Sequence, residues 1–551
     1  MTGILVKPAR VAELARSFPT WPSWNLTARQ LCDLELLLNG GFAPLSGYMC
    51  RTDYESCLEY MRLSDGTLWP IPVLLDVPEP VARDLAPGLS LILRDLEGVP
   101  LAVLHVRDVW RPDLDREARA IYGTTSVSHP AVQRLMERTD RWNVGGDVEG
   151  IRLPHHYDFV NLRHTPADIR RETARRGWSA VVAFPTRRLI HPAEFEMTRR
   201  FIGKVGGGLL LHPIVETAQP ADFDYYMRVR CFQHAFRRYP VAEAMLSLLP
   251  LATRMAGLRE VIWRAIIEKN HGCTHIIVCQ DDPETGMEQG YPPDTTETRD
   301  LLDRCAAEIG VALLQTRNIV DGSNSKEDVT FPEVAEELRR RYPPMDRVGF
   351  TIFFTGLSGA GKSTVSNLVR IRLLERGGRR VSFLDGDLVR RHLSSELGFS
   401  REHRDMNIRR IGFVASEITK IGGIAICAPI APYDAIRREV RKAIEAVGGF
   451  VLVFVDTPID VCEQRDRKGL YAKARAGLIP EFTGVSDPYE PPLDAEVVVR
   501  TTEVSAEEGA NRVIEYLERT GYLGRPDITD DPPEHIESNP APTSRRHDRD
   551  Q

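Results

Sequence analysis

Residues 349–374 constrain the fold more than any other part of this 551-residue chain. An apolar run, FTIFF (350–354), is followed by GLSGAGKS (356–363) and by the helix-like run TVSNLVRIRLL (364–374). GLSGAGKS fits the pattern G-x-x-x-x-G-K-S, whose glycines let backbone N–H groups surround phosphate oxygens at a helix N-terminus. A strand, this loop and a helix in that order predict a nucleotide-binding α/β domain.

The loop supplies the candidate phosphate site. Lys362 can reach the β and γ phosphates of a nucleotide, and the Ser363 hydroxyl can ligate Mg²⁺. We therefore expect ATP as a substrate, Mg²⁺ as its cofactor and Lys362 as a catalytic residue. A glycine-rich turn that merely joins a strand to a helix is the structural alternative, and the complete motif in this context argues against it. The predicted site comprises Gly356, Ser358, Gly359, Ala360, Gly361, Lys362, Ser363 and Thr364.

Two acidic residues follow the next strand-like run, VSFLDGD (381–387). Asp385 and Asp387 fall where a second strand would end beside the phosphate loop. Carboxylates in that place can hold Mg²⁺ through water or accept a proton from an attacking hydroxyl, so both are candidate catalytic residues. An acidic turn in which Asp-Gly simply reverses the chain is the alternative.

Two basic stretches come next. Residues 388–412 are rich in arginine and could bind an anionic second substrate, while Phe399 could stack on a base. Residue spacing alone favours a solvated helix face for this segment. The stretch RDRKGLYAKARAG (465–477) could close over phosphates as a basic lid.

Together these segments resemble adenylylsulfate (APS) kinase, and they cover residues 347–524 in the order typical of that family. The resemblance implies a P-loop kinase with a parallel sheet that transfers the γ phosphate of MgATP to the 3′-hydroxyl of APS. The matching words are FTGLSGAGKST (354–364), LDGDLVR (384–390), LGFS (397–400), NIRRIG (407–412), VFVDTP (453–458), KGLYAKARAG (468–477) and FTGVSDPYE (482–490).

The same resemblance assigns roles to single residues. Asp387 matches a carboxylate that acts as base or metal partner. Four residues match groups that hold the APS nucleotide, and Lys468 of the KGLYAKARAG word joins them: Arg390, Phe399, Arg404, Asn407 and Lys468. One word departs from the pattern, because the family reads S-P-Y-R where this chain has Ala431-Pro432-Tyr433-Asp434. That change removes a hydroxyl and replaces an arginine with an acid.

Residues 10–320 resemble ATP sulfurylase, which makes APS from ATP and sulfate. Sulfurylase followed by kinase is a known bifunctional arrangement. The words that carry this resemblance are RQLCDLELLLNGGFAPLSGYM (29–49), MRLSDGTLWPIP (61–72), YGTTSVSHPAV (122–132), LLLHPIV (209–215), RVRCFQ (228–233) and IIEKNHGCTH (266–275).

The catalytic motifs of the ATP sulfurylase family are altered in this chain. Where the family has Q-T-R-N-P-x-H-x-x-H, residues 185–194 keep only Thr186, Arg187 and His191, and Glu194 replaces an imidazole near ATP phosphates. The family's G-R-D-H word reads CQDD (279–282), and a segment of several dozen residues before Phe331 is missing. A QTRN word at 315–318 lies far from the expected strand, and we interpret it as coincidence.

The pattern of apolar runs predicts a multidomain α/β chain. Residues 1–162 read as a mostly β domain, and 163–320 as a parallel α/β domain in which 242–270 is the clearest helical stretch. The resemblance implies a PUA-like fold for the first and a Rossmann-like nucleotidyltransferase fold for the second. A linker with a short helix (321–346) leads to the kinase domain at 347–524. The Pro-rich, charged remainder, 525–551, has too few apolar residues to fold and is predicted to be disordered.

Bulk properties exclude several classes of protein. The formal net charge is −7 with acids and bases interspersed, which gives no reason to expect nucleic acid as a partner. No run of 18 apolar residues occurs, so we expect no membrane association and a cytoplasmic location. Nine scattered cysteines form no CxxC pair. The resemblance implies a homo-oligomer, either a dimer or a hexamer.

Three interpretations remain open at this stage. The first is an APS kinase whose sulfurylase-like region no longer makes APS but still folds and serves in assembly or in binding a nucleotide. The second is a working bifunctional enzyme with a rearranged sulfurylase site. The third makes the N-terminal part a pure oligomerisation or regulatory module.

Overall fold

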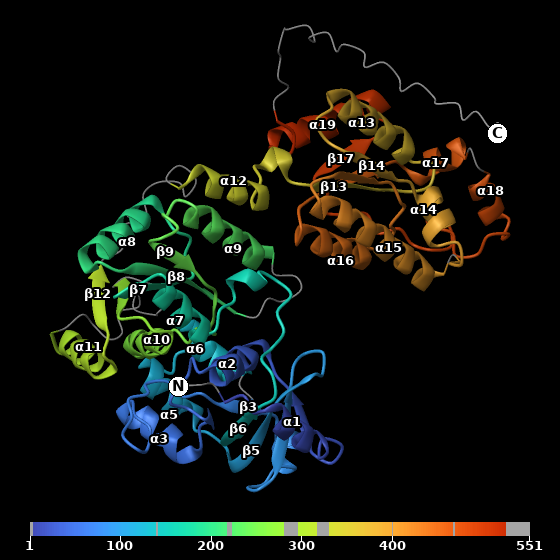
Figure 1. The fold of residues 1–551 in the computed structure, drawn as a ribbon. Helices are drawn as coiled ribbons and strands as arrows, with labels where there is room; N and C mark the ends of the chain where they lie inside the picture. The colour runs from blue at the N-terminus through green and yellow to red at the C-terminus, as the bar shows by residue number, and fades with distance from the viewer. Residues whose placement is uncertain are drawn as a thin grey trace, which may run out of the picture. The chain divides into compact units, whose positions relative to one another are not determined.

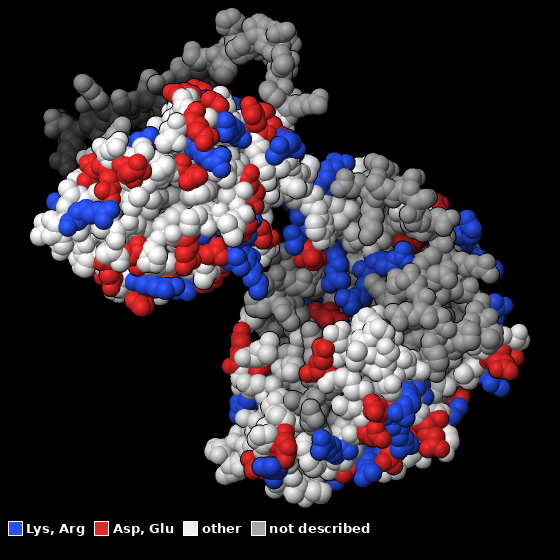
Figure 2. Space-filling view, turned by 180° about the vertical axis from the view of Figure 1, so that it is seen from behind, with Lys and Arg blue, Asp and Glu red and all other residues white. Residues whose placement is uncertain are grey.

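The computed structural model describes residues 4–138, 142–216, 223–279, 296–316, 330–398, 400–466 and 469–524. The chain divides into two compact units, Met1–Arg341 and Tyr342–Gln551, each with its own sheets and core (Figure 1). Within the described residues, no helix combines the length and apolar character needed to cross a bilayer. Figure 2 shows acidic and basic side chains interspersed over most of the face that it presents.

The first unit begins with a six-stranded sheet in the order β1-β4-β5-β6-β2, with β3 also paired to β6. Strands β4, β5 and β6 are antiparallel neighbours, which agrees with the predicted β-rich domain. The strands are β1 (Ser23–Asn25), β2 (Gly47–Tyr48), β3 (Leu75–Val77), β4 (Ser90–Arg94), β5 (Pro100–Trp110) and β6 (Trp142–Gly150), and the helices are α1 (Pro8–Ala15), α2 (Ala28–Asn39), α3 (Arg51–Tyr60), α4 (Glu79–Arg83), α5 (Leu114–Tyr122) and α6 (Pro130–Arg138).

A second sheet of the first unit has the order β10-β8-β7-β11-β12, with β9 beside β8, and all its pairings are parallel. Alternation of strands and helices produces this α/β layer, as predicted. Its strands are β7 (Val181–Thr186), β8 (Gly208–Val215), β9 (Ala244–Leu246), β10 (Leu249–Pro250), β11 (His275–Cys279) and β12 (Ala312–Thr316), and its helices are α7 (Pro166–Arg175), α8 (Pro192–Val205), α9 (Phe223–Phe236), α10 (Leu258–Asn270), α11 (Thr296–Ile309) and α12 (Pro332–Arg341).

The prediction of one helical stretch over 242–270 was wrong in its first half. That half forms the short strands β9 and β10, and only α10 is helical. Pro250 and Gly257, whose φ is +57°, separate the two halves and prevent a continuous helix. Leucines before the break are buried in the sheet, where a short apolar strand is indistinguishable by pattern from a buried helix.

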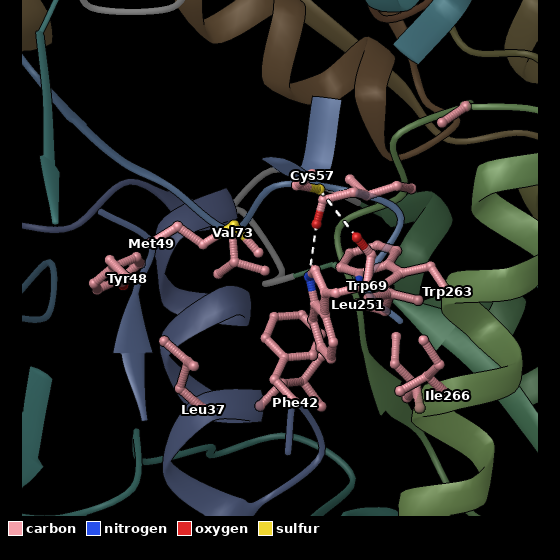
Figure 3. Close-up of a cluster of buried hydrophobic side chains, with 14 of the residues drawn as sticks. Leu37, Phe42, Tyr48, Met49, Cys57, Trp69, Val73, Leu251, Trp263 and Ile266 are labelled. Carbon is pink, nitrogen blue, oxygen red and sulfur yellow. Dashed lines mark hydrogen bonds between the residues drawn. The ribbon is translucent and has the colours of Figure 1, made fainter. Parts of the chain in front are cut away.

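One continuous core joins the two sheets of the first unit. Phe42 lies between Trp69 and Trp263, with ring centroids 5.8 and 5.3 Å apart, and Trp263 comes from α10 (Figure 3). The buried carboxylate of Asp33 on α2 accepts a hydrogen bond of 2.6 Å from Arg254, which precedes α10. These contacts hold the β-rich and α/β parts together as one body.

Helix α12 was predicted as part of a linker. It packs against α9, where Arg230 pairs with Glu337 at 2.8 Å, and just after α9 Arg238 pairs with Glu333 at 2.6 Å. Phe331 at its start contacts Phe195 at a centroid distance of 5.9 Å. This part of the predicted 321–346 connector therefore belongs to the first unit, while the remaining domain boundaries stay predictions.

The second unit is a five-stranded parallel sheet in the order β14-β15-β13-β16-β17. Helices α13 and α19 pack together on one face, and α15 and α16 on the other (Figure 1). The strands are β13 (Phe350–Thr355), β14 (Val381–Leu384), β15 (Ile424–Cys427), β16 (Gly449–Asp456) and β17 (Val497–Arg500), and the helices are α13 (Lys362–Arg376), α14 (Gly386–Leu393), α15 (Arg401–Lys420), α16 (Asp434–Glu445), α17 (Ile459–Arg465), α18 (Leu470–Arg475) and α19 (Ala506–Arg519).

Candidate functional sites

The phosphate loop lies between the central strand β13 and helix α13. Gly356, Gly359 and Gly361 have φ values of +145°, +77° and +104°, which residues with a Cβ rarely adopt. A Cβ at Gly356 would lie 2.5 Å from the carbonyl oxygen of Val455. The glycines are therefore required by backbone conformation and by the neighbouring strand β16. The loop ends at the N-terminus of α13, where backbone N–H groups favour an anion.

Lys362, the first residue of α13, curls back over the loop. Its side chain is buried, and Nζ donates hydrogen bonds of 2.8 Å to the carbonyl oxygens of both Gly356 and Leu357. The ammonium group is thus placed at the mouth of the loop. Ser363 follows in the first turn of the helix and offers the hydroxyl oxygen that Mg²⁺ accepts as a ligand.

The backbone positions of the two candidate acidic residues lie at the same edge of the sheet. Asp385 directly follows β14, and Asp387 is in the first turn of α14. All strands of this sheet are parallel, so the carboxyl end of β14 faces the same side as that of β13. The Ser363 hydroxyl and the Asp385 carboxylate are oxygen ligands of the kind that Mg²⁺ prefers. The side chain of Asp387 lies outside the described part of the chain.

Side chains from distant segments bind carbonyl groups of the phosphate loop. The Tyr471 hydroxyl on α18 donates to the Ser358 carbonyl at 2.9 Å, and the Thr457 hydroxyl donates to that of Ala360, also at 2.9 Å. Asp466 accepts the backbone N–H of Leu470 at 2.8 Å at the start of α18. The predicted basic lid is therefore tied to the loop through Tyr471, a residue the sequence reasoning did not single out.

Three of the predicted APS-binding residues are described. Arg390 on α14 donates to the carbonyl oxygens of Leu397 and Gly398, both at 3.0 Å. Arg404 and Asn407 lie one turn apart on α15. Asn407 is 7% exposed, and its amide oxygen has no hydrogen-bond partner within the described residues. Phe399 and Lys468 lie outside the described residues.

A cavity of about 610 Å³ opens beside the phosphate loop. This volume lies within the roughly 300–1,000 Å³ typical of small-molecule sites. Phe454 and Tyr489 line it with their rings stacked at 6.1 Å, and Leu357, Asp456 and Asp487 contribute to its wall. None of these residues was predicted as part of the site. All five nevertheless lie within segments that carry the APS kinase resemblance, namely FTGLSGAGKST (354–364), VFVDTP (453–458) and FTGVSDPYE (482–490).

The altered word at 431–434 has a local structural role. Ala431 is buried with φ of +45°. Its carbonyl oxygen accepts a hydrogen bond of 2.7 Å from the buried Arg437. Asp434 begins α16 and pairs with Arg437 at 3.3 Å and Arg438 at 2.7 Å, so its charge is favourable at the helix N-terminus.

The surviving sulfurylase-type residues lie where β7 meets α8. Arg187 donates to Thr253 at 2.9 Å and to Glu216 at 3.3 Å. His191 precedes α8 as its N-cap, and its Nδ1 accepts the backbone N–H of Ala193 at 3.3 Å. Thr186, at the end of β7, accepts the backbone N–H of Arg188 at 3.0 Å. Each of these residues is engaged in local structure.

Glu194 is buried as the third residue of α8. Its carboxylate accepts the backbone N–H of His191 at 2.9 Å, which completes a capping box. The cavity that Glu194 borders, together with Pro185, Thr186, Arg188 and Arg264, has a volume of about 30 Å³. Space of that size holds about one water molecule. Gln280, Asp281 and Asp282 lie outside the described residues, as does Arg317 of the QTRN word.

Replacing Glu194 separates its structural role from its charge. We expect Glu194→Ala to destabilise the chain by about 1 kcal/mol, because the His191 N–H loses its acceptor. The melting temperature should fall by about 2 °C. Glu194→Gln keeps an acceptor oxygen and should melt close to the parent. Calorimetric scans of the full chain measure both, and equal melting of the Ala and Gln variants would contradict the capping role.

Comparisons with known proteins agree with this arrangement. Family profiles match residues 2–153 as a PUA-like domain, 160–327 as ATP-sulfurylase and 348–500 as adenylylsulphate kinase. A sulfate adenylyltransferase of Mycosarcoma maydis is 42% identical over 94% of this chain and 98% of its own. One from Emericella nidulans is 40% identical over 93% and 96%.

A solved structure also matches nearly the whole chain. The hexameric APS kinase from Thiobacillus denitrificans superposes with a TM-score of 0.73 at 36% identity, covering 95% of this chain and 98% of that one. The altered catalytic words thus occur in a chain that matches its relatives from end to end. This chain therefore belongs to the sulfate adenylyltransferase family and joins a PUA-like domain and a sulfurylase domain to a P-loop APS kinase domain.

Proposed function

We propose that this chain transfers the γ phosphate of MgATP to the 3′-hydroxyl of APS, and that its sulfurylase domain does not make APS. The observation that carries the first part is the complete phosphate loop with Lys362 held at its mouth, next to a cavity of about 610 Å³. A nucleotide-sized acceptor fits that space.

The reaction needs positioning and charge compensation more than covalent chemistry. Mg²⁺ bound with ATP would be held by Ser363 and, through water, by the carboxylates after β14, and it would neutralise charge on the phosphates. Lys362 stabilises charge that develops on the transferred phosphoryl group. Asp387 accepts the proton of the 3′-hydroxyl. Arg390, Arg404 and Asn407 hold the acceptor nucleotide, with Phe399 and Lys468 as further binding residues.

Phosphate passes directly from ATP to APS in this mechanism. At position 431 the chain has a buried alanine, which offers no nucleophile. In-line displacement between two bound nucleotides requires no covalent enzyme intermediate. We expect no phosphorylated protein when the chain is quenched during turnover with γ-labelled ATP and APS. Label that appears on the protein and is then transferred to APS at the rate of turnover would contradict direct transfer.

Three observations support loss of the sulfurylase reaction. Arg187 is bound by Thr253 and Glu216, and Glu194 places a buried carboxylate beside the altered word. The pocket that Glu194 borders, as its described lining residues define it, has a volume of about 30 Å³. The Thiobacillus denitrificans protein, which matches 95% of this chain, is described as an APS kinase.

The alternative is a bifunctional enzyme that makes APS and then phosphorylates it. The names of the relatives from Mycosarcoma maydis and Emericella nidulans favour it, because both are sulfate adenylyltransferases that match this chain over nearly their whole length. The continuous core of the first unit is compatible with either function, and also with a role in assembly. By likeness to the hexameric neighbour, we favour a hexamer over a dimer.

The kinase half of the proposal is tested by measuring ADP formation from MgATP with and without APS. We expect ADP to form at a rate that saturates with APS, in step with a product that carries one additional phosphate on the 3′-oxygen. ADP formation that is independent of APS would contradict the assigned acceptor.

Measurements of molecular mass in solution on the same preparation distinguish a hexamer from a dimer.

A further inference from the structure

The carboxylate of Asp487 lies where three segments of the second unit meet. Its Oδ2 accepts hydrogen bonds of 2.7 Å from Arg404 on α15 and of 2.7 Å from the Tyr433 hydroxyl, which precedes α16. Arg404 also donates to the Thr483 hydroxyl at 2.7 Å and to the carbonyl oxygen of Glu481. The loop around Asp487 thus fixes the guanidinium from several directions.

These groups are largely withdrawn from water. The side chains of Arg404 and Asp487 are 11% and 18% exposed, and Tyr433 is buried. Burial, together with the bond to Asp487, raises the pKa of Tyr433 to about 12, so the phenol remains a protonated donor. An ion pair in such surroundings is screened less by salt than a surface pair.

The position of Asp487 connects this ion pair to the acceptor site. Asp487 lines the cavity beside the phosphate loop. Arg404 lies one helical turn before Asn407, whose buried amide oxygen has no partner within the described residues. Residues three apart on a helix share one face. The direction of the Arg404 guanidinium is therefore fixed on the helix face that also carries Asn407, a residue predicted to bind APS.

We propose that Asp487 is a positioning residue for the acceptor nucleotide, which acts by orienting Arg404 and compensating its charge. This inference rests on the proposed APS kinase function. A guanidinium paired with a carboxylate offers N–H donors in fixed directions but little net attraction for anions. Arg404 then contributes to how the nucleotide is oriented, and the anionic phosphosulfate is recognised elsewhere in the site.

Replacing Asp487 should weaken the binding of APS and leave the binding of ATP nearly unchanged. In Asp487→Asn the guanidinium loses its charged partner, and only its hydrogen bonds to Thr483 and to the Glu481 carbonyl still fix its direction. We expect the KM for APS to rise about tenfold, as for loss of a charge-assisted hydrogen bond. The KM for ATP and kcat at saturating APS should stay within about twofold. General loss of structure would instead lower kcat and affect both substrates.

A double-mutant cycle tests whether Asp487 acts through Arg404. The four chains are the full-length parent, Asp487→Asn, Arg404→Ala and the double variant, each assayed for APS-dependent ADP formation. The proposal requires that Asp487→Asn adds no further rise in KM for APS when Arg404 is already alanine. The proposal would be overturned if the two substitutions raised the KM for APS by factors that multiply in the double variant. An unchanged KM for APS in Asp487→Asn would overturn it as well.

Tyr433→Phe is the matched control, because it removes the other hydrogen bond to the same oxygen while the Arg404 pair remains. Its KM for APS should change less than about threefold. A rise in KM for APS equal to that of Asp487→Asn would show that the carboxylate acts on the loop and not on Arg404.

Asp487→Glu is the substitute variant if Asp487→Asn melts well below the parent, because it retains the charge. It enters the same cycle, and the proposal again requires that it adds no rise in KM for APS when Arg404 is alanine. A parent chain without APS-dependent ADP formation would refute the proposed function itself.

Discussion

Replacing Lys362 with alanine should lower kcat for APS-dependent ADP formation by at least about a thousandfold. The ammonium group lies at the mouth of the phosphate loop, bound to the carbonyl oxygens of Gly356 and Leu357. Without it, negative charge that develops on the transferred phosphoryl group loses a positioned cation. Steady-state rates at saturating MgATP and APS measure the effect.

Lys442→Ala provides the control for Lys362→Ala. Lys442 is an exposed lysine on α16 in the same unit, so its replacement removes the same charge away from the loop. Its rate should match that of the parent. If Lys362→Ala retained more than a tenth of the parent rate, the phosphate loop would not be the nucleotide site of this enzyme.

Asp387→Asn should reduce kcat by about a hundredfold to ten-thousandfold while the KM for ATP changes only a few-fold. Asparagine has nearly the same shape as aspartate but cannot accept the proton of the 3′-hydroxyl at neutral pH. Asp387 lies in the first turn of α14, directly after β14 and at the carboxyl edge of the parallel sheet. The measurement is kcat and both KM values for the full chain.

Asp385→Asn shows which of the two carboxylates acts as the base. Asp385 is two residues away, before α14 begins. If Asp385 mainly supports Mg²⁺, its variant should be partly rescued by higher Mg²⁺ concentration, and the Asp387 variant should not. Full turnover in Asp387→Asn together with loss in Asp385→Asn would reverse the assignment.

The sequence predicted the phosphate site well because its determinants are local. The glycines, Lys362 and the first turn of α13 lie within one short word, and the expected strand and helix surround it as β13 and α13. Partners from distant segments could not be predicted in the same way. Tyr471 and Ser358 are 113 positions apart, and Arg404 and Asp487 are 83 apart. Such contacts depend on tertiary packing, which no short motif encodes.

The first unit shows a different limit of prediction. Its division into a β-rich part and a parallel α/β part followed from strand and helix patterns and is confirmed. Glu268 lay in a predicted helix, yet it is fully buried, where it accepts from His212 Nδ1 at 2.9 Å. Hydrophobic patterning predicts that a glutamate lies on the surface unless it is paired. The partner of Glu268, His212, lies on β8, 56 positions earlier, so no local pattern indicates the pair.

The altered sulfurylase motif at residues 185–194 also has a structural role that the residue types alone did not indicate. Glu194 was predicted as a repulsive charge near ATP phosphates. In the folded chain it also caps α8 and borders a cavity for about one water. This capping role is compatible with the proposal that the site no longer makes APS. The sequence relatives alone would favour the opposite conclusion, since they are sulfate adenylyltransferases.

The central claim is that this chain phosphorylates APS but does not make it. Its most direct test uses the full-length Lys362→Ala chain, in which APS consumption is blocked, with MgATP, sulfate and labelled pyrophosphate. We predict no sulfate-dependent exchange of label into ATP above background, while the parent chain forms ADP from MgATP and APS at ordinary enzyme rates. Sulfate-dependent exchange at turnover rates of about 1 s⁻¹ or more would contradict the account and establish a bifunctional enzyme.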